Sequence, residues 1–266
     1  MGARPVAYLG MPAGVEARGV AVKTIGLIGG MSWESTAEYY RLVNEFTRDR
    51  LGGLHSARCV LYSVDFAEIE RLQVQGRWAE AGDVLAAAAR ALEAAGADMV
   101  LICTNTMHKV ADRVEEAVSV PLLHLADATA EAVRASGLRR VGLLGTAFTM
   151  EQDFYRGRLE ACGLEVLVPD AAGRKAVHQV IYEELCLGIV REESRAAYRE
   201  IIADLVAGGA EGVVLGCTEI ELLIDAGDSP VPVFPTARLH AEAAVNAALS
   251  GWSQEDGPQQ GRRSAP

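Results

Sequence analysis

The fold is decided by the stretch KTIGLIGGMSWESTAEYYRL (23–42), which is echoed by RRVGLLGTAFTMEQDFYRGRL (139–159). A second pair follows the same pattern, GADMVLICTNT (96–106) and GAEGVVLGCTEI (209–220). Gly26 and Gly142 are 116 residues apart, and Cys103 and Cys217 are 114 apart. Two echoes at nearly the same offset indicate an internal duplication, in which each half spans roughly 110 residues.

Short apolar runs alternate with stretches of helical spacing along the whole repeat. Strands are predicted over 23–30, 57–64, 97–102 and near 122–124, and helices over 32–51, 78–95, 105–118 and 127–135. Ser32 is the expected N-cap of the first helix. This alternation is typical of an α/β fold with mostly parallel sheets flanked by helices. Two such halves are expected to face each other across a cleft that holds the active site.

The domain boundaries follow from the duplication. The first half is predicted to comprise 23–121 together with 235–250, because the final helix, 236–249, is expected to pack back on it. The second half is predicted to comprise 122–234. Residues 1–22 form an expected disordered extension that does not look like a secretory signal, and 251–266, rich in Gly, Pro, Gln and Arg, form an expected disordered tail.

Composition narrows the function classes. The chain has 266 residues, of which 50% are hydrophobic, so it can bury a substantial core. A net charge of −11 without a basic stripe argues against nucleic acid and anionic membranes as partners, and no apolar run reaches the ~18 residues of a membrane span. Five cysteines without a CxxC pair argue against a disulfide framework or a zinc site and favour a reduced, cytoplasmic setting. A small-molecule enzyme or a protein-binding module remains.

Cys103 and Cys217 occupy matching places in the two halves. Each follows an apolar strand and precedes a threonine and a predicted helix, so both thiols are expected to project into the cleft, with pKa values lowered by the helix N-termini. One thiolate could remove a proton from a carbon while the opposite thiol returns one, which inverts the stereocentre. The alternative is that both are buried apolar cysteines. Cys59, Cys162 and Cys186 have no counterpart in the repeat and are expected to be structural.

Polar residues next to the two cysteines suggest a substrate site. Thr104, Asn105 and Thr106 supply hydroxyls, an amide and backbone N–H groups that suit a carboxylate, although ordinary N-capping would also explain them. Glu219 could orient a thiol or an amine, or simply favour the start of a helix. The GLIGGM turn lacks the third glycine of a dinucleotide-binding loop, but its amides, near Met31 and Ser32, could hold a carboxylate.

Together these stretches resemble the aspartate/glutamate racemase superfamily, and within it the aspartate racemase branch with its broad-specificity amino-acid racemases. The resemblance runs from Lys23 to Leu249. It is carried by GLIGGMSWEST (26–36), LGGLHSA (51–57), YSVDFAEIE (62–70), CTNTMHKVAD (103–112), TMEQDFYRGRL (149–159), IYEELCLG (181–188) and GCTEIELL (216–223). It implies two flavodoxin-like halves, catalysis without a cofactor or metal, and one catalytic cysteine from each half.

The resemblance also implies roles for individual residues. Cys103 and Cys217 become the two acid/base residues, and the substrate-binding positions fall on Met31, Gln73, Thr104, Asn105 and Thr106. Arg174 or Lys175 could contact an acidic substrate side chain. Pro235 departs from the family pattern, which has Asp before the threonine, and this puts efficiency or specificity in doubt.

The sequence therefore predicts a cytoplasmic, cofactor-independent racemase acting on aspartate or on a broad range of amino acids, with a homodimer as a further implication of the resemblance. Two alternatives stay open. One is another reaction on the same fold, that of a hydantoin racemase, a maleate-type isomerase or a decarboxylase. The other is a non-catalytic amino-acid-binding protein.

Overall fold

Two parallel sheets form the centre of the structure, a computed structural model that describes residues 22–250. Within this range the first sheet has the order β2-β1-β3, built from β1 (Ile25–Gly29), β2 (Cys59–Ser63) and β3 (Met99–Ile102). The second has the order β5-β4-β6-β7, built from β4 (Arg140–Gly145), β5 (Glu165–Leu167), β6 (Gly212–Gly216) and β7 (Val233–Pro235). The expected disordered segments, 1–22 and 251–266, lie outside the described residues except for residue 22.

The second sheet repeats the first. An isolated parallel bridge between Val100 and Leu122 extends the first sheet beyond β3 in the way that β7 extends the second beyond β6. Every position of β1, β3 and β6 is buried, as expected for parallel strands covered by helices on both faces. The predicted α/β fold with two mostly parallel sheets is confirmed. The exact residue boundaries of the halves stay a prediction.

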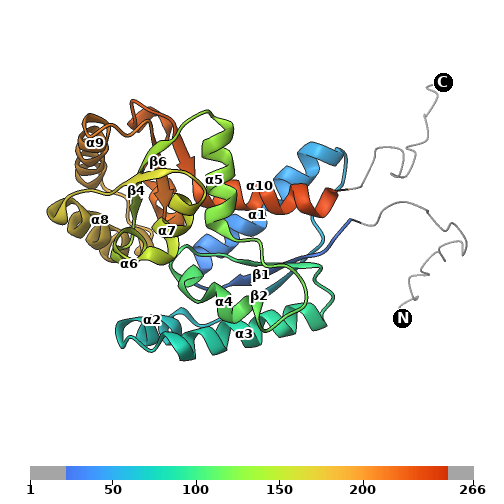
Figure 1. Ribbon diagram of the computed structural model, residues 1–266. Coiled ribbons are helices and arrows are strands. Elements are labelled where there is room, and N and C mark those ends of the chain that lie inside the picture. The colour runs from blue at the N-terminus through green and yellow to red at the C-terminus, as the bar shows by residue number, and fades with distance from the viewer. Residues whose placement is uncertain (1–21, 251–266) are drawn as a thin grey trace, which may run out of the picture.

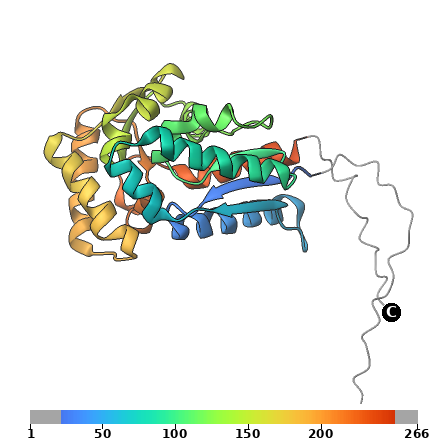
Figure 2. The same cartoon turned by 90° about the horizontal axis from the view of Figure 1, so that it is seen from below.

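Helices cover both faces of the first sheet (Figure 1). On one face α1 (Trp33–Leu51) and α10 (Thr236–Leu249) lie side by side and enclose a core that includes Leu27 and Tyr39. On the other face α3 (Trp78–Ala94) packs Leu85 against the sheet, and Figure 2 shows it running along the strands. The final helix thus packs on the first sheet, and it also contacts the helix Leu125–Ala135.

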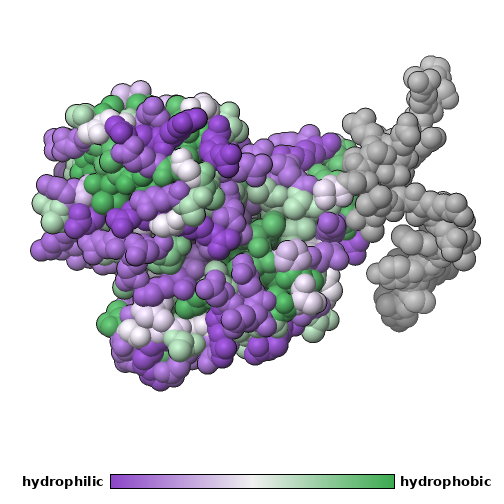
Figure 3. Space-filling model, viewed as in Figure 1, coloured by the Kyte–Doolittle hydropathy of each residue, from purple (hydrophilic) through white to green (hydrophobic). Residues whose placement is uncertain are grey.

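The second sheet is enclosed in the same manner. One face packs against α5 (Leu125–Ala135) and α7 (Asp153–Ala161), and the other against α6 (Ala147–Glu151), α8 (Ala171–Glu183) and α9 (Glu192–Ala207). Side chains alternate between the faces, so that Leu143 points to α5 and α7 while Leu144 points to α8 and α9. Figure 3 shows hydrophilic residues over most of the visible surface, with apolar residues confined to patches.

Three segments differ from the expectations. The helix predicted over 105–118 is instead a 3-10 turn, η1 (Thr106–Val110), followed by the short α4 (Ala111–Glu115). The Thr-Asn-Thr run before it carries side chains that compete for backbone hydrogen bonds, which disfavours a regular helix start. The strand near 122–124 is a single bridge, and α2 (Phe66–Val74), which the alternation did not predict, precedes α3.

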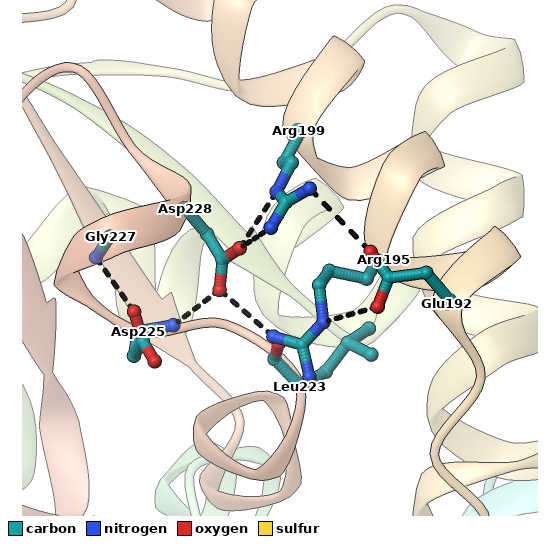
Figure 4. Close-up of polar contacts among 7 residues, drawn as sticks. All are labelled: Glu192, Arg195, Arg199, Leu223, Asp225, Gly227 and Asp228. Carbon is teal, nitrogen blue, oxygen red and sulfur yellow. Dashed lines mark hydrogen bonds and ion pairs between the residues drawn. The ribbon is translucent and has the colours of Figure 1, made fainter.

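A buried carboxylate ties the loop after β6 to α9 (Figure 4). Asp228, in the 3-10 turn η4 (Ala226–Asp228), accepts hydrogen bonds from Arg195 at 2.9 Å and from Arg199 at 2.7 Å. It also accepts one from the backbone N–H of Asp225. Desolvation works to raise the pKa of this carboxyl, but the hydrogen bonds outweigh it and the pKa lies below its ordinary value.

Asp228→Asn should therefore lower the free energy of unfolding by about 2 kcal/mol, because two guanidinium groups lose their shared anion. Urea denaturation at pH 7 measures the change. Since the folded-state pKa is depressed, the stabilisation is present above the ordinary aspartate range and fades as the pH falls through the folded-state value. Asp153→Asn, which breaks an exposed ion pair with Arg156, is the matched control and should cost less than about 0.5 kcal/mol. Equal losses in the two variants would contradict the role of Asp228.

Candidate active site

A narrow pocket lies where the carboxyl ends of the strands of the two sheets meet. The two sequence halves both contribute to it. Within residues 22–250 it is lined by Met31, Phe66, Gln73, Thr104, Thr106, Thr146, Ile181, Tyr182, Cys186, Cys217 and Glu219. Ligands bind preferentially at such strand ends and between domains, so this pocket is the candidate site.

The glycine turn after β1 places Met31 in this pocket. Gly30 has φ +90°, and a Cβ there would approach the carbonyl oxygen of Val64 to 2.1 Å, so only glycine fits. Gln73 reaches the pocket from α2, and its amide nitrogen donates to the sulfur of Met107 at 3.1 Å. Met31 and Gln73 are both predicted from the sequence as substrate-binding residues, and both line the pocket.

Cys217 is paired with a carboxylate. Its thiol donates to one oxygen of Glu219 at 3.0 Å, and the hydroxyl of Ser32 donates to the other oxygen at 2.8 Å. Burial raises the pKa of this thiol well above its usual value, and the neighbouring Glu219 and Cys186 raise it further. The expected lowering of the pKa by a helix N-terminus is wrong, since the residues after Cys217 form only the 3-10 turn η3 (Thr218–Leu222).

Cys103 does not share the pocket with Cys217. It is fully buried in the core of the first half with Leu27, Tyr39 and Ala237, and burial raises the pKa of its thiol rather than lowering it. Met99 and Leu101 point into the same core, and Cys103 continues their alternation at the end of β3. The next residue, Thr104, consequently turns toward the pocket.

Strand pairing shows why the sequence echo misleads here. Gly26 of β1 pairs with Val100, and its counterpart Gly142 of β4 pairs with Val213. Four residues after Val100 stands Thr104, and four residues after Val213 stands Cys217. The structural repeat is therefore shifted by one residue from the cysteine echo, and the position equivalent to Cys217 is Thr104. The expectation that both thiols face one cleft is not met.

Buried histidines support the loop that carries Thr104. The Nδ1 of His108 lies 2.8 Å from the carbonyl oxygen of Thr104, and its Nε2 accepts from the backbone N–H of Leu125 at 3.2 Å. The rings of His124 and His240 lie beside it, with centroids 4.5 and 5.8 Å from that of His108. Burial lowers the pKa of all three histidines, so they are neutral at pH 7.

Asn105 joins segments rather than lining the pocket. It is buried, and its amide nitrogen donates to the hydroxyl of Thr236 at 3.1 Å. That hydroxyl donates in turn to the carbonyl oxygen of Leu215 in β6. Pro235, the residue that departs from the family pattern, ends β7 immediately before this link. Thr106 does line the pocket, and its hydroxyl lies 3.2 Å from that of Thr146 in the second half.

The basic residues proposed to contact an acidic side chain lie outside the pocket. The guanidinium of Arg174 forms an ion pair with Glu151 at 2.8 Å and donates to the carbonyl oxygen of Pro169. Lys175 is exposed on α8.

Several pocket residues were not expected from the sequence. Phe66, Thr146, Ile181, Tyr182 and Cys186 line it, and so does Glu219, for which the sequence left two roles open. The sequence could have indicated four of them. Ile181, Tyr182 and Cys186 lie in IYEELCLG (181–188), one of the stretches that carry the resemblance, and Thr146 follows the glycine that ends β4. In the described range no set of three His, Cys, Asp or Glu residues is placed to hold a metal ion, and no helix is long and apolar enough to cross a membrane.

Comparisons with known proteins agree with this architecture. The family model described as Asp/Glu/hydantoin racemase matches residues 28–244. The broad specificity amino-acid racemase RacX of Bacillus subtilis is 22% identical over 239 residues, which cover 85% of this chain and 98% of that protein.

Two solved structures of racemase-like proteins are similar to this chain along most of its length. A Yersinia pestis protein provisionally assigned as an Asp/Glu racemase is 57% identical with a TM-score of 0.81, and an aspartate racemase homologue from Pyrococcus horikoshii is 38% identical with a TM-score of 0.76. Each covers 85% of this chain and 99% of its own. With the family model matched over most of its length, the chain belongs to the Asp/Glu/hydantoin racemase family.

Proposed function

We propose that this protein is an amino-acid racemase that works without a cofactor. One observation carries the proposal: equivalent strand ends of the two halves present Thr104 and the Cys217–Glu219 pair to a single pocket. Inversion at Cα requires proton transfer on opposite faces of one carbon, and groups from two facing halves suit that requirement. The family and the racemase names of its relatives support the same reaction.

Cys217 is the proposed base on one face. At rest its thiol is protonated and donates to Glu219, so the carboxylate can take the thiol proton while the sulfur takes the proton of Cα. A substrate ammonium group near Glu219 would offset the negative charge that now raises the pKa of the thiol. Thr106 and Gln73 line the same pocket and are the proposed donors of hydrogen bonds that stabilise the substrate as negative charge develops at Cα.

Thr104 is the proposed proton donor on the opposite face. Its hydroxyl occupies the repeat position that matches Cys217, and the carbonyl group of the same residue is held by His108. Proton delivery through this hydroxyl, which takes up a proton from water as it gives one to Cα, completes the inversion, and the proton left on Glu219 returns to water. In the reverse reaction the same transfers run backward. Cys103, the residue that the sequence predicts for this role, would act there only if the β3 end rearranged.

Deuterium exchange at Cα tests the function. The reduced protein is incubated in D₂O with a panel of L-amino acids, and we expect deuterium at Cα together with the D-enantiomer for at least one of them. Cys217→Ser, which keeps a small hydrogen-bonding side chain, is the matched control and should show neither. A folded, reduced protein that exchanges no amino acid on the panel would refute the proposed racemase.

A further inference from the structure

The pocket shared by Thr104 and Cys217 is poor in positive charge. Among its described lining residues Glu219 is the single carboxylate, and none is a lysine or an arginine. The other side chains offer hydroxyls, one amide, thiols and apolar surface, the last from Met31, Phe66 and Ile181. A negatively charged ligand group would therefore meet neutral hydrogen-bond donors at best.

Arg71, two residues before Gln73, is exposed on α2, and two further cations close in sequence to pocket residues are engaged elsewhere. Lys109 lies 3.9 Å above the ring of Trp78, and its ammonium group donates to the side-chain oxygen of Gln152 at 2.6 Å. Arg174 is held by Glu151 and the Pro169 carbonyl oxygen.

The charges that do act on the pocket are negative. Burial raises the pKa of Cys186 to about 12, with further increases from Glu219 and Glu34. Burial also raises the pKa of Tyr182, to which Glu70 and Glu219 contribute. A neighbouring hollow that shares Glu219 with this pocket is lined further by Glu34, Ser35, Glu38, Thr218, Glu221 and Leu222. The carboxylates Glu219, Glu34 and Glu70 thus disfavour an additional anion in the pocket.

From this lining we infer that the substrates are amino acids with uncharged side chains rather than aspartate or glutamate, an inference that rests on the proposed racemase function. Glu219 can balance the single ammonium group of an amino acid, and the threonine hydroxyls can bind its single α-carboxylate. A second carboxylate would be desolvated without a cationic partner and close to Glu219, which is costly. Asparagine and glutamine, which match the acidic residues in shape, avoid that cost.

The isosteric pairs give a direct test. We would measure kcat/KM for Cα exchange with Asn against Asp and with Gln against Glu, and the Kd of the same four ligands by calorimetry. The amide should exceed the acid by about tenfold or more in both measurements. Equal or better use of the acids would overturn the inference.

Substitutions locate the origin of the selectivity. Phe66→Arg places a cation at the pocket wall and should lower the Asn/Asp ratio by about tenfold, whereas Phe66→Leu should leave the ratio unchanged. Lys109→Gln, Arg174→Gln and Lys175→Gln should each change it by less than about twofold, since these groups lie outside the pocket. If one of these three variants lost turnover of aspartate, its cation would be shown to bind the substrate side chain, and the inference would be overturned.

The two proposals fail in different ways. Exchange with acids and amides alike would retain the racemase and overturn the charge selectivity. If no amino acid exchanges, the racemase is refuted, and the Kd values alone then decide whether the pocket prefers uncharged side chains.

Discussion

Thr104→Ala is expected to lower kcat for racemisation by about 100-fold or more, while Cys103→Ala leaves it within about fivefold of the parent. The reason is the register of the repeat, which brings Thr104 to the pocket that Cys217 also lines and leaves the Cys103 thiol in the core with Tyr39. Cys217→Ser should cost about 1000-fold or more, because the base at this position must give up its own proton to Glu219, which a thiol does far more readily than a hydroxyl, whereas Thr104 only passes a proton on from water. Stopped-time assays by chiral chromatography measure all three.

The comparison needs a control for folding, since Cys103 is fully buried. Cys103→Ala removes one sulfur from the core and should lower stability by about 1 kcal/mol, which thermal unfolding detects without a loss of activity per folded molecule. Thr104→Ser, which keeps the hydroxyl, should retain most of the activity that Thr104→Ala loses. Full activity in Thr104→Ala with an inactive, folded Cys103→Ala would restore the two-cysteine hypothesis and reject the assignment of Thr104.

The second large effect is a loss of stability in acid, driven by buried histidines. Desolvation lowers the pKa of His240 to about 4 and that of His124 to about 3, and it lowers the pKa of His108 well below its usual value. Below pH 6.5 these histidines are protonated in the unfolded chain but stay neutral in the folded chain. The free energy of unfolding is therefore at its full value above this pH and falls as the pH drops toward the folded-state pKa values. For His240 alone the loss approaches about 3 kcal/mol by pH 4.

Urea unfolding at intervals between pH 7.5 and 4.5 measures this dependence, and His240→Gln provides the matched variant. The glutamine can still donate to the Leu123 carbonyl oxygen and accept from the Tyr39 hydroxyl, the partners that His240 now has at 2.8 and 2.9 Å. Its stability curve should be shallower than that of the parent by up to about 1.4 kcal/mol per pH unit below pH 6. Parallel curves for the two proteins would mean that His240 does not control the acid response.

Much of the architecture follows from local sequence. The glycine turns, the apolar runs and the N-cap at Ser32 specify β1, α1, α3 and β3 close to their observed limits, because these signals act within one or two turns of chain. The duplication further predicts two similar sheets and the return of α10 to the first half. Met31, Gln73, Thr104, Thr106 and Cys217 were also predicted as site residues and all line the pocket.

What the sequence by itself determined is thus the class of fold, the repeat and the strand ends at which the site lies. Tertiary structure decided which side chains at those strand ends face the pocket. Successive side chains of an extended chain point in opposite directions, so a shift of one residue exchanges Cys103 for Thr104, and only the pairing of β3 with β1 sets that register. Packing between distant segments likewise brought Glu219 to Ser32, and His108 to the backbone N–H of Leu125 at the start of α5. No local sequence pattern specifies these contacts.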